Sequence, residues 1–319
     1  MSKSFTPPGN VGEFHSVALD NGLIRVVVIP ELGGRVWQLE DRIRGREWIW
    51  HRDDVPLGRA DTGASYDEVW AGGWEELFPN DAPGVFEGRS LPDHGEWWTL
   101  PWDVAECSDE RLKLVARSSV VKATCSKEYR LARGEARVSV TYRILSNEER
   151  PFHFLFKQHL PVRLSSDCSL SLPGGIVTTV DPEFGSIVRS GERFLWPRFA
   201  GDQGRSADLS LVRPKTSEDR EFVYVSGLPE PWCGVDDHGS GASLRMEFDA
   251  DAFPFVWLFI SYGGWRGVNT VVLEPCTNMP KDLAEAVRLG QSARLQPGQE
   301  FVTTVSVSLS ECRTTSPFA

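Results

Sequence analysis

Alternation of apolar and polar residues, repeated in many short segments, most constrains the fold of this chain. In residues 136–145, Val138, Val140, Tyr142 and Ile144 alternate with polar residues. A period of two places such apolar side chains on one face of a half-buried β-strand. Residues 301–310 repeat the pattern, with an apolar residue or a threonine at every odd position. The chain is therefore expected to be built mainly of β-strands.

Further strands are expected in residues 22–30, 111–123, 151–164, 220–228 and 242–249, with Arg133-Gly134 as a hairpin turn. One helix is expected between Pro280, which suits a first helical position, and Gly290, which suits the C-terminal end. Short strands joined by Gly- and Pro-rich turns predict an all-β sandwich or barrel.

No internal repeat or low-complexity linker divides the chain. We therefore expect a single domain spanning residues 1–319, with residues 1–12 as a flexible N-terminus. The polar stretch 201–221 is expected to be a long loop within this domain.

The charge of the chain bears on its partners and location. A net charge of −11 argues against a nucleic-acid partner and against anionic membrane surfaces. The longest apolar run, residues 253–260, is too short to cross a bilayer, and the N-terminus has no apolar run typical of a signal peptide. The six cysteines form no CxxC pair, which is typical of reduced cysteines. A cytoplasmic protein is the expectation.

Residues 70–102 combine tryptophan, glycine and ionisable groups more densely than any other segment. The segment holds five tryptophans, the pair Gly72-Gly73, and His94 in a Pro-Asp-His-Gly turn. Flat aromatic faces suit the C–H faces of a sugar ring, and polar groups suit its hydroxyls. The alternative is that most of these tryptophans belong to the core and that two or three line a site.

A carboxylate closes a hydrophobic strand in "VVLEP", residues 271–275. Desolvating Glu274 there is costly, and the ordinary explanation is a salt bridge or a solvated strand end. A partly buried carboxylate can also have its pKa raised toward neutrality, which suits a general base.

Several motifs in order resemble the galactose mutarotase-like superfamily, especially its hexose-phosphate mutarotase branch. They are Gly72-Gly73 followed by Phe78-Pro79, His94-Gly95 followed by Trp102, the strand "FLFKQHLPV" at 154–162, "VVLEPCTNMP" at 271–280 and the turn "LQPGQEF" at 295–301. The hairpin "GGRVWQLEDRIRGREWIW" at 33–50 is similar to an early hairpin of the family. Together these segments cover roughly residues 20 to 310.

The resemblance implies a large antiparallel β-sandwich with a sugar cleft, and an aldose 1-epimerase activity that interconverts α- and β-anomers by ring opening. It implies that Glu274 is the catalytic base and His159 the acid, while His94 steadies the ring oxygen or a hydroxyl. The expected partner is a small carbohydrate. No cofactor or metal is expected, although a metal site built from His94, Glu96 and His159 is an alternative. Monomer and homodimer both remain open.

Residues expected to contact the sugar are Trp74, Glu75, Asn80, Trp98, Arg35 and Asp219. The phosphosugar branch has an arginine four residues after its first histidine, where this chain has Trp98. An arginine binds an anionic group through paired hydrogen bonds, and a tryptophan does not. The expected ligand is therefore a neutral sugar rather than its 6-phosphate.

Two other functions compete with the mutarotase. A carbohydrate-binding protein of the same fold requires the aromatic surface but not the pair of Glu274 and His159. A glycoside hydrolase requires two carboxylates, such as Glu75 or Glu76 with Glu274. Increased anomer exchange in one of a panel of sugars separates the enzyme from the binding protein.

Overall fold

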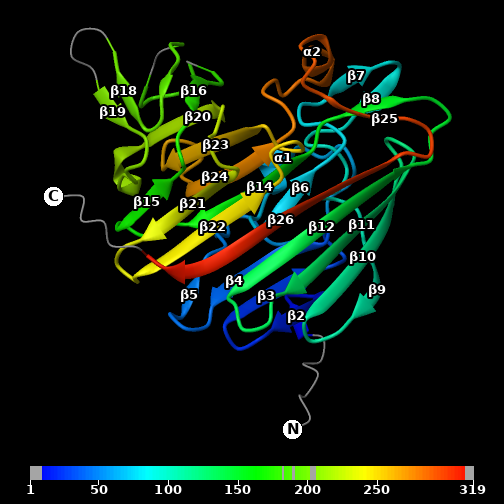
Figure 1. Ribbon diagram of the computed structural model, residues 1–319, viewed down its shortest axis with the longest axis horizontal. Coiled ribbons are helices and arrows are strands. Elements are labelled where there is room, and N and C mark those ends of the chain that lie inside the picture. The colour runs from blue at the N-terminus through cyan, green and yellow to red at the C-terminus, as the bar shows by residue number, and fades with distance from the viewer. Residues whose placement is uncertain (1–8, 182, 189–190, 202–205, 313–319) are drawn as a thin grey trace.

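The computed structural model describes residues 9–181, 183–188, 191–201 and 206–312. Its largest sheet is antiparallel and has eight strands (Figure 1). In order across the sheet these are β15 (Cys168–Ser171), β21 (Trp232–Asp237), β22 (Ala242–Phe248), β26 (Glu300–Glu311), β12 (Arg137–Ser146), β11 (Ala123–Leu131), β10 (Arg111–Ser118) and β9 (Asp103–Cys107).

A second sheet has seven strands and a third has five. The seven-stranded sheet runs β17 (Phe194–Leu195), β16 (Ile176–Thr179), β20 (Asp219–Ser226), β23 (Phe255–Tyr262), β24 (Asn269–Cys276), β14 (Lys157–Arg163) and β6 (Glu75–Leu77). The five-stranded sheet contains β1 (Gly9–Val11), β2 (Phe14–Asp20), β3 (Ile24–Ile29), β4 (Arg35–Asp41) and β5 (Arg46–Glu47).

The remaining described elements are short. Three two-stranded sheets pair β7 (Gly84–Phe86) with β8 (Arg89–Leu91), β13 (Phe152–Phe154) with β25 (Ala293–Leu295), and β18 (Arg198–Ala200) with β19 (Ser206–Asp208). The helices are α1 (Tyr66–Val69), α2 (Leu283–Arg288) and the 3-10 turn η2 (Lys215–Ser217).

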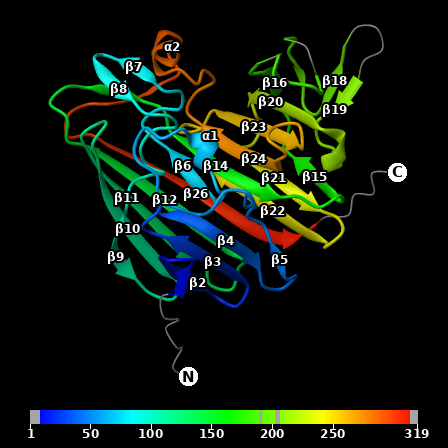
Figure 2. The same ribbon diagram turned by 180° about the vertical axis from the view of Figure 1, so that it is seen from behind.

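The core lies between the sheets. Figure 1 shows the eight-stranded sheet on the near side, and Figure 2, from behind, shows the five-stranded sheet and β6 in front of it. One hydrophobic cluster joins all three sheets, with buried members such as Val26 of β3, Val140 of β12 and Leu273 of β24. This arrangement is an all-β antiparallel sandwich, as the alternating pattern and the resemblance predicted.

Most strand predictions hold, but the segment 111–123 ends as a strand at Ser118, and the segment 151–164 is divided between β13 and β14, which lie in different sheets. Val138, Val140, Tyr142 and Ile144 are all buried on β12, and residues 301–310 lie within β26. Gly134 has a φ of +72° in the turn between the paired strands β11 and β12, a conformation in which glycine carries no steric penalty.

Three further predicted boundaries were wrong. The helix begins at Leu283 rather than Pro280, because the Asp282 side chain caps it by accepting a hydrogen bond from the Glu285 backbone N–H at 2.8 Å. The segment 201–221 is not all loop, since it contains β19, η2 and the start of β20. Residues 9–11 form β1 and pair with β2, while residues 1–8 of the expected flexible N-terminus lie outside the described residues.

Candidate active site

A cavity of about 330 Å³ lies over one face of the seven-stranded sheet. Four neighbouring strands line it with Phe222 of β20, Trp257 and Phe259 of β23, Glu274 of β24, and Lys157 and His159 of β14. Helix α1 and the loops add Tyr66, Asp67, Trp70, Asp81, His94, Val180, Asp181, Phe184, Trp265 and Lys281. All three predicted catalytic residues therefore line one cavity.

Strand geometry explains why the polar groups of the sheet converge. Lys157 and His159 are two residues apart on β14, so their side chains lie on the same face. Glu274 is on the next strand, β24, and Trp257 stands directly opposite it on β23. Alternation along three adjacent strands thus builds one wall of the cavity.

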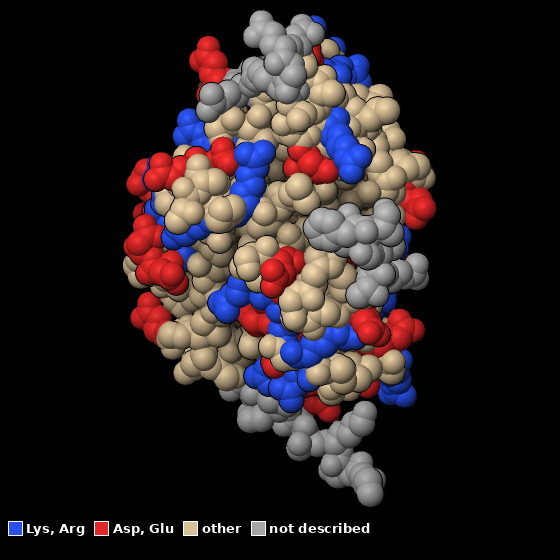
Figure 3. Space-filling view, turned by 90° about the vertical axis from the view of Figure 1, so that its left-hand side faces the viewer, with Lys and Arg blue, Asp and Glu red and all other residues tan. Residues whose placement is uncertain are grey.

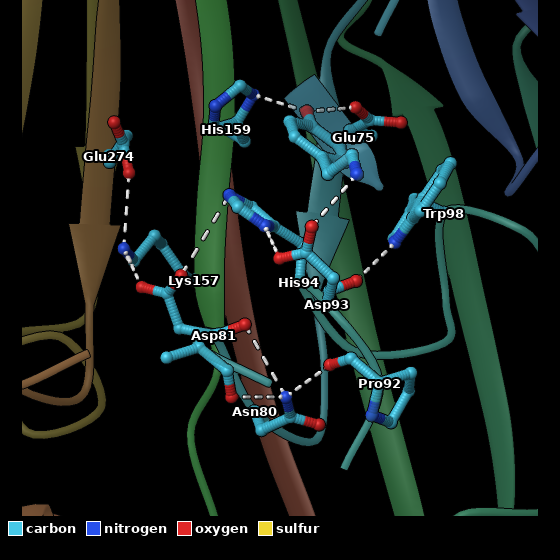
Figure 4. Close-up of polar contacts among 12 residues, drawn as sticks. Glu75, Asn80, Asp81, Pro92, Asp93, His94, Trp98, Lys157, His159 and Glu274 are labelled. Atoms are coloured by element: carbon cyan, nitrogen blue, oxygen red, sulfur yellow. Dashed lines mark hydrogen bonds and ion pairs between the residues drawn. The ribbon is translucent and has the colours of Figure 1, made fainter. Parts of the chain in front are cut away.

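A lysine bridges two carboxylates in this wall. The Lys157 ammonium lies 3.3 Å from Glu274 Oε2 and donates a hydrogen bond to Asp81 Oδ2. Dashed lines mark both contacts in Figure 4. Burial raises the pKa of Glu274 to about 7, and Lys157 opposes that rise. A carboxyl group with this pKa can both take and return a proton near neutral pH.

Lys157 itself stays charged. Burial alone lowers the pKa of its ammonium, but the negative charges of Asp81 and Glu274 outweigh burial and raise the pKa above its ordinary value. The ammonium also lies 3.2 Å from the centre of the Trp257 ring, a cation–π contact. The lysine therefore holds the site's carboxylates together as a permanent cation.

His94 is held by its neighbours in the loop before β9. Its Nδ1 lies 2.7 Å from Asp93 Oδ1, and its ring stacks on that of Tyr66 with centroids 4.0 Å apart. Burial lowers the pKa of His94, but the hydrogen bond to Asp93 and the charge of Asp81 outweigh burial and raise it above its ordinary value. His94 is thus the histidine of the cavity that favours the charged form.

His159 has the opposite environment. Burial, together with the positive charges of His94, Lys157 and Arg35, lowers the pKa of His159 well below its ordinary value. Its Nδ1 lies 3.1 Å from the Tyr66 hydroxyl. At neutral pH His159 is therefore a neutral imidazole.

The far side of the cavity is aromatic. Phe222 and Phe259 pair across β20 and β23, and Phe184 and Trp265 each pack against Phe259, with ring centroids 5.9 and 5.3 Å apart. These four rings are only partly buried. The cavity thus has one polar wall and one aromatic wall, an arrangement that suits the two kinds of surface of a sugar ring.

None of the six residues expected to contact the sugar lines this cavity. Trp74, Glu75 and Arg35 lie beneath or behind the wall: the Trp74 indole donates to Gln158 Oε1 at 3.0 Å, and Arg35 pairs with Glu75 at 2.5 Å. Each is at most 5% exposed, so neighbouring side chains take the place that the prediction gave to the ligand.

The other three shape the loops or lie elsewhere. The Asn80 amide donates to the backbone carbonyls of Ala82 and Pro92 at 3.0 and 2.6 Å (Figure 4). Trp98 is buried and donates to the carbonyl oxygen of Asp93 at 3.2 Å. Asp219 begins β20 and pairs with Arg213 at 2.9 Å.

Some site residues escaped sequence analysis for different reasons. Lys157 could have been found, because it stands two residues before His159 on a predicted strand. Asp81 and Tyr66 come from loop and short-helix segments that carry no periodic signal. The aromatic wall joins residues as distant in sequence as Phe184 and Trp265, and only strand pairing brings them together.

Glu96 does not join His94 and His159 at the cavity, so the alternative metal site is not formed. The Glu96 carboxylate turns away from the cavity and accepts hydrogen bonds from the backbone of Ser119 and Val120. Among the described residues, no group of three or more His, Cys, Asp or Glu side chains is arranged to hold a metal ion.

Two further features bear on partners. Over the described part of the chain no helix has the length and apolarity needed to cross a membrane. On the face shown in Figure 3, acidic and basic side chains are intermixed, without a broad basic surface.

Comparison with known proteins places the fold. Neither a protein-family model nor a curated protein matches the chain significantly. Among solved structures, the Slr1438 protein of Synechocystis sp. PCC 6803 is 18% identical with a TM-score of 0.69, covering 98% of this chain and 99% of its own.

Two other similar structures have informative names. A galactose mutarotase related enzyme of Lactobacillus acidophilus is 14% identical with a TM-score of 0.67, covering 93% of this chain and 98% of its own. A galactose mutarotase-like protein of Clostridium acetobutylicum is 12% identical with a TM-score of 0.68, covering 96% and 98%. The chain therefore has the galactose mutarotase-like fold, a large antiparallel β-sandwich.

Proposed function

We propose that the protein is an aldose 1-epimerase-like isomerase, which interconverts the α- and β-anomers of a small sugar. The convergence of Glu274, His94 and His159 on one cavity carries this proposal. The fold supports it, since a galactose mutarotase related enzyme shares that fold. A cytoplasmic location and a small-molecule ligand belong to the same proposal.

The reaction needs two coupled proton transfers. Glu274 takes the proton of the anomeric hydroxyl as the bond between C1 and the ring oxygen breaks, and an acid protonates the ring oxygen. The open aldehyde rotates about C1–C2, and the reversed transfers close the ring on the other face. Each well-placed acid or base contributes about 10²–10⁴ to the rate.

The acid is assigned here to His94. The family resemblance assigns it to His159, but burial keeps that imidazole neutral, and a neutral imidazole is a poor proton donor. The Asp93 carboxylate favours the protonated form of His94. His159 instead accepts a hydrogen bond from a ligand hydroxyl at the wall of the cavity.

The charged groups that line the cavity favour a neutral sugar as the ligand. The ionisable carboxylates of the cavity are Asp67, Asp81, Asp181 and Glu274, whereas its lysines are Lys157 and Lys281. Lys157 is already engaged by two of these carboxylates, and His94, which favours its charged form, is engaged by Asp93. A phosphate dianion would meet more negative than free positive charge, which disfavours it.

Saturation-transfer NMR on freshly dissolved aldoses, ketoses and uronates tests the proposal, with D-glucose 6-phosphate and D-galactose 6-phosphate included. We expect faster anomer exchange for at least one neutral sugar and none for the phosphates. Binding of a sugar without faster exchange would favour the non-catalytic carbohydrate-binding protein. The hydrolase alternative loses support, because Glu75 and Glu76 do not line the cavity.

A further inference from the structure

A chain of polar contacts runs under the cavity wall and ends at His159. Arg35 Nη2 lies 2.5 Å from Glu75 Oε2. The other carboxylate oxygen of Glu75 accepts a hydrogen bond from the Tyr66 hydroxyl. That hydroxyl oxygen lies 3.1 Å from His159 Nδ1. Arg35, Glu75, Tyr66 and His159 are all at least nine-tenths buried.

The positions of the protons in this series of contacts follow from which groups can donate and which can accept. Arg35 is always charged and can only donate. Burial raises the pKa of Glu75, but Arg35 and the hydrogen bond from Tyr66 oppose that rise, and a carboxylate in close contact with a guanidinium favours the ionised form, which can only accept. The Tyr66 hydroxyl has a single proton, which it donates to Glu75. The contact between Tyr66 and His159 therefore requires the proton to be on His159 Nδ1.

Packing also fixes the orientation of the His159 ring. The His159 ring meets Tyr66 edge-on, with centroids 5.5 Å apart at 88°, and meets Trp70 at 5.2 Å and 75°. In Figure 4 the second ring nitrogen of His159 points away from this chain of contacts, toward the side on which Glu274 lies. With Nδ1 protonated and the ring neutral, Nε2 carries a lone pair.

We propose that Arg35, Glu75 and Tyr66 are positioning residues that hold His159 as the Nδ1–H tautomer, so that its Nε2 accepts a hydrogen bond from a sugar hydroxyl. The role as hydroxyl acceptor rests on the proposed function, whereas the tautomer does not. His159 then selects for a sugar that has this hydroxyl, because a sugar lacking it leaves Nε2 without a hydrogen-bond partner.

Nitrogen-15 NMR of histidine-labelled protein without sugar tests the tautomer directly at pH 7.5. His159→Asn identifies the signals that belong to His159. We expect Nδ1 of the wild type to be protonated and Nε2 to resonate as an unprotonated ring nitrogen. A wild-type His159 protonated at Nε2 would overturn the proposal, whether or not the protein proves to be an enzyme.

Tyr66→Phe tests the series of contacts that ends at His159, and Tyr142→Phe is its matched control. Tyr142 is also buried and donates its hydroxyl proton to a glutamate of β6, Glu76, at 2.6 Å, but it does not line the cavity. We expect Tyr66→Phe to move the proton of His159 partly or wholly to Nε2, and Tyr142→Phe to leave the His159 signals unchanged. Unchanged signals in Tyr66→Phe would overturn the role of Tyr66.

Kinetics with D-glucose and D-galactose separate this inference from the proposed function. Where the wild type exchanges anomers of either sugar, Tyr66→Phe should raise KM about 2- to 10-fold, the value of one hydrogen bond. Tyr142→Phe should leave KM unchanged. A wild type that exchanges no neutral sugar of the whole panel would count against the proposed function, and the NMR result would still decide the tautomer.

Discussion

Two polar networks involve the same pair of strands, β6 and β14, and lie on opposite faces of the seven-stranded sheet. Strands β6 and β14 pair so that Glu75 stands opposite His159 and Glu76 opposite Gln158. Glu75 and His159 lie on the cavity side. Glu76 and Gln158 lie on the core side, where the Tyr142 hydroxyl reaches both of them at 2.6 and 3.0 Å.

The two networks use similar chemistry for different ends. On the core side Lys127 pairs with Glu76, and both are at most 2% exposed. Burial lowers the pKa of Lys127, which Glu76 opposes. On the cavity side a basic residue again pairs with a glutamate and a tyrosine, but the chain ends at His159, which lines a cavity. A buried ion pair therefore marks a candidate site only where its network reaches a space that a ligand can enter.

Glu274→Gln gives the largest expected effect on the cavity side. The amide cannot take a proton, so anomer exchange should fall by about 10²–10⁴, the contribution of one general base. The thermal midpoint should stay near that of the wild type, because Lys157 keeps its contact with Asp81. Saturation-transfer NMR and thermal unfolding measure the two quantities. A variant that retains a tenth or more of wild-type exchange would rule out Glu274 as the base.

The pH profile separates the two histidines. Exchange should rise with pH as Glu274 loses its proton, with a midpoint near 7, its raised pKa. Exchange should fall again at pH values above the pKa of His94, because the acid is then deprotonated; despite burial, the hydrogen bond to Asp93 and the charge of Asp81 raise this pKa above its ordinary value. We expect a bell-shaped profile for kcat/KM in the wild type.

Substitution assigns each limb of that profile. His94→Asn should slow exchange by about 10²–10⁴ and remove the alkaline limb. His159→Asn should keep both limbs and raise KM. Loss of the alkaline limb in His159→Asn, with the limb retained in His94→Asn, would restore His159 as the acid.

Lys127→Met breaks the core-side network. It leaves the Glu76 carboxylate buried without its cation, which typically costs about 3–5 kcal/mol of unfolding free energy. Denaturant unfolding measures the loss, and exchange per folded molecule should stay unchanged. The double substitution Lys127→Met with Glu76→Gln should recover part of the stability, since no uncompensated charge remains. Equal losses in the single and double variants would contradict this account.

Sequence reasoning predicted more of the fold than of the site. Alternation at Val138, Val140, Tyr142 and Ile144 reflects burial on one face, and burial is a local property of a strand. The sequence also singled out Glu274, which stands at the end of a hydrophobic strand. These signals need only neighbouring residues, so a single sequence contains them.

The six residues predicted to contact the ligand do not line the cavity, because lining depends on which face of a strand or loop meets that space. Trp74 and Glu75 are adjacent on the chain, and neither lines the cavity, although both stand beside residues of the site. Tyr66 and Asp81 were missed because they come from a short helix and a loop, and the tertiary fold, rather than any local pattern, brings them beside His159 and Lys157.

Trp98→Phe gives the smallest expected effect and tests whether Trp98 contacts the sugar or only packs within the protein. The sequence suggested that Trp98 stacks on a sugar, but the ring is 4% exposed and packs edge-on against Tyr66 at 5.1 Å. Phenylalanine keeps an aromatic ring and loses the hydrogen bond to the carbonyl of Asp93, so we expect about 1 kcal/mol less stability.

Trp102→Phe, in the main hydrophobic core, is the control for loss of an indole. Competition titrations with D-galactose and its 6-phosphate should give the same ratio of affinities in wild type and both variants. A ratio that changes in Trp98→Phe alone would return Trp98 to the ligand site.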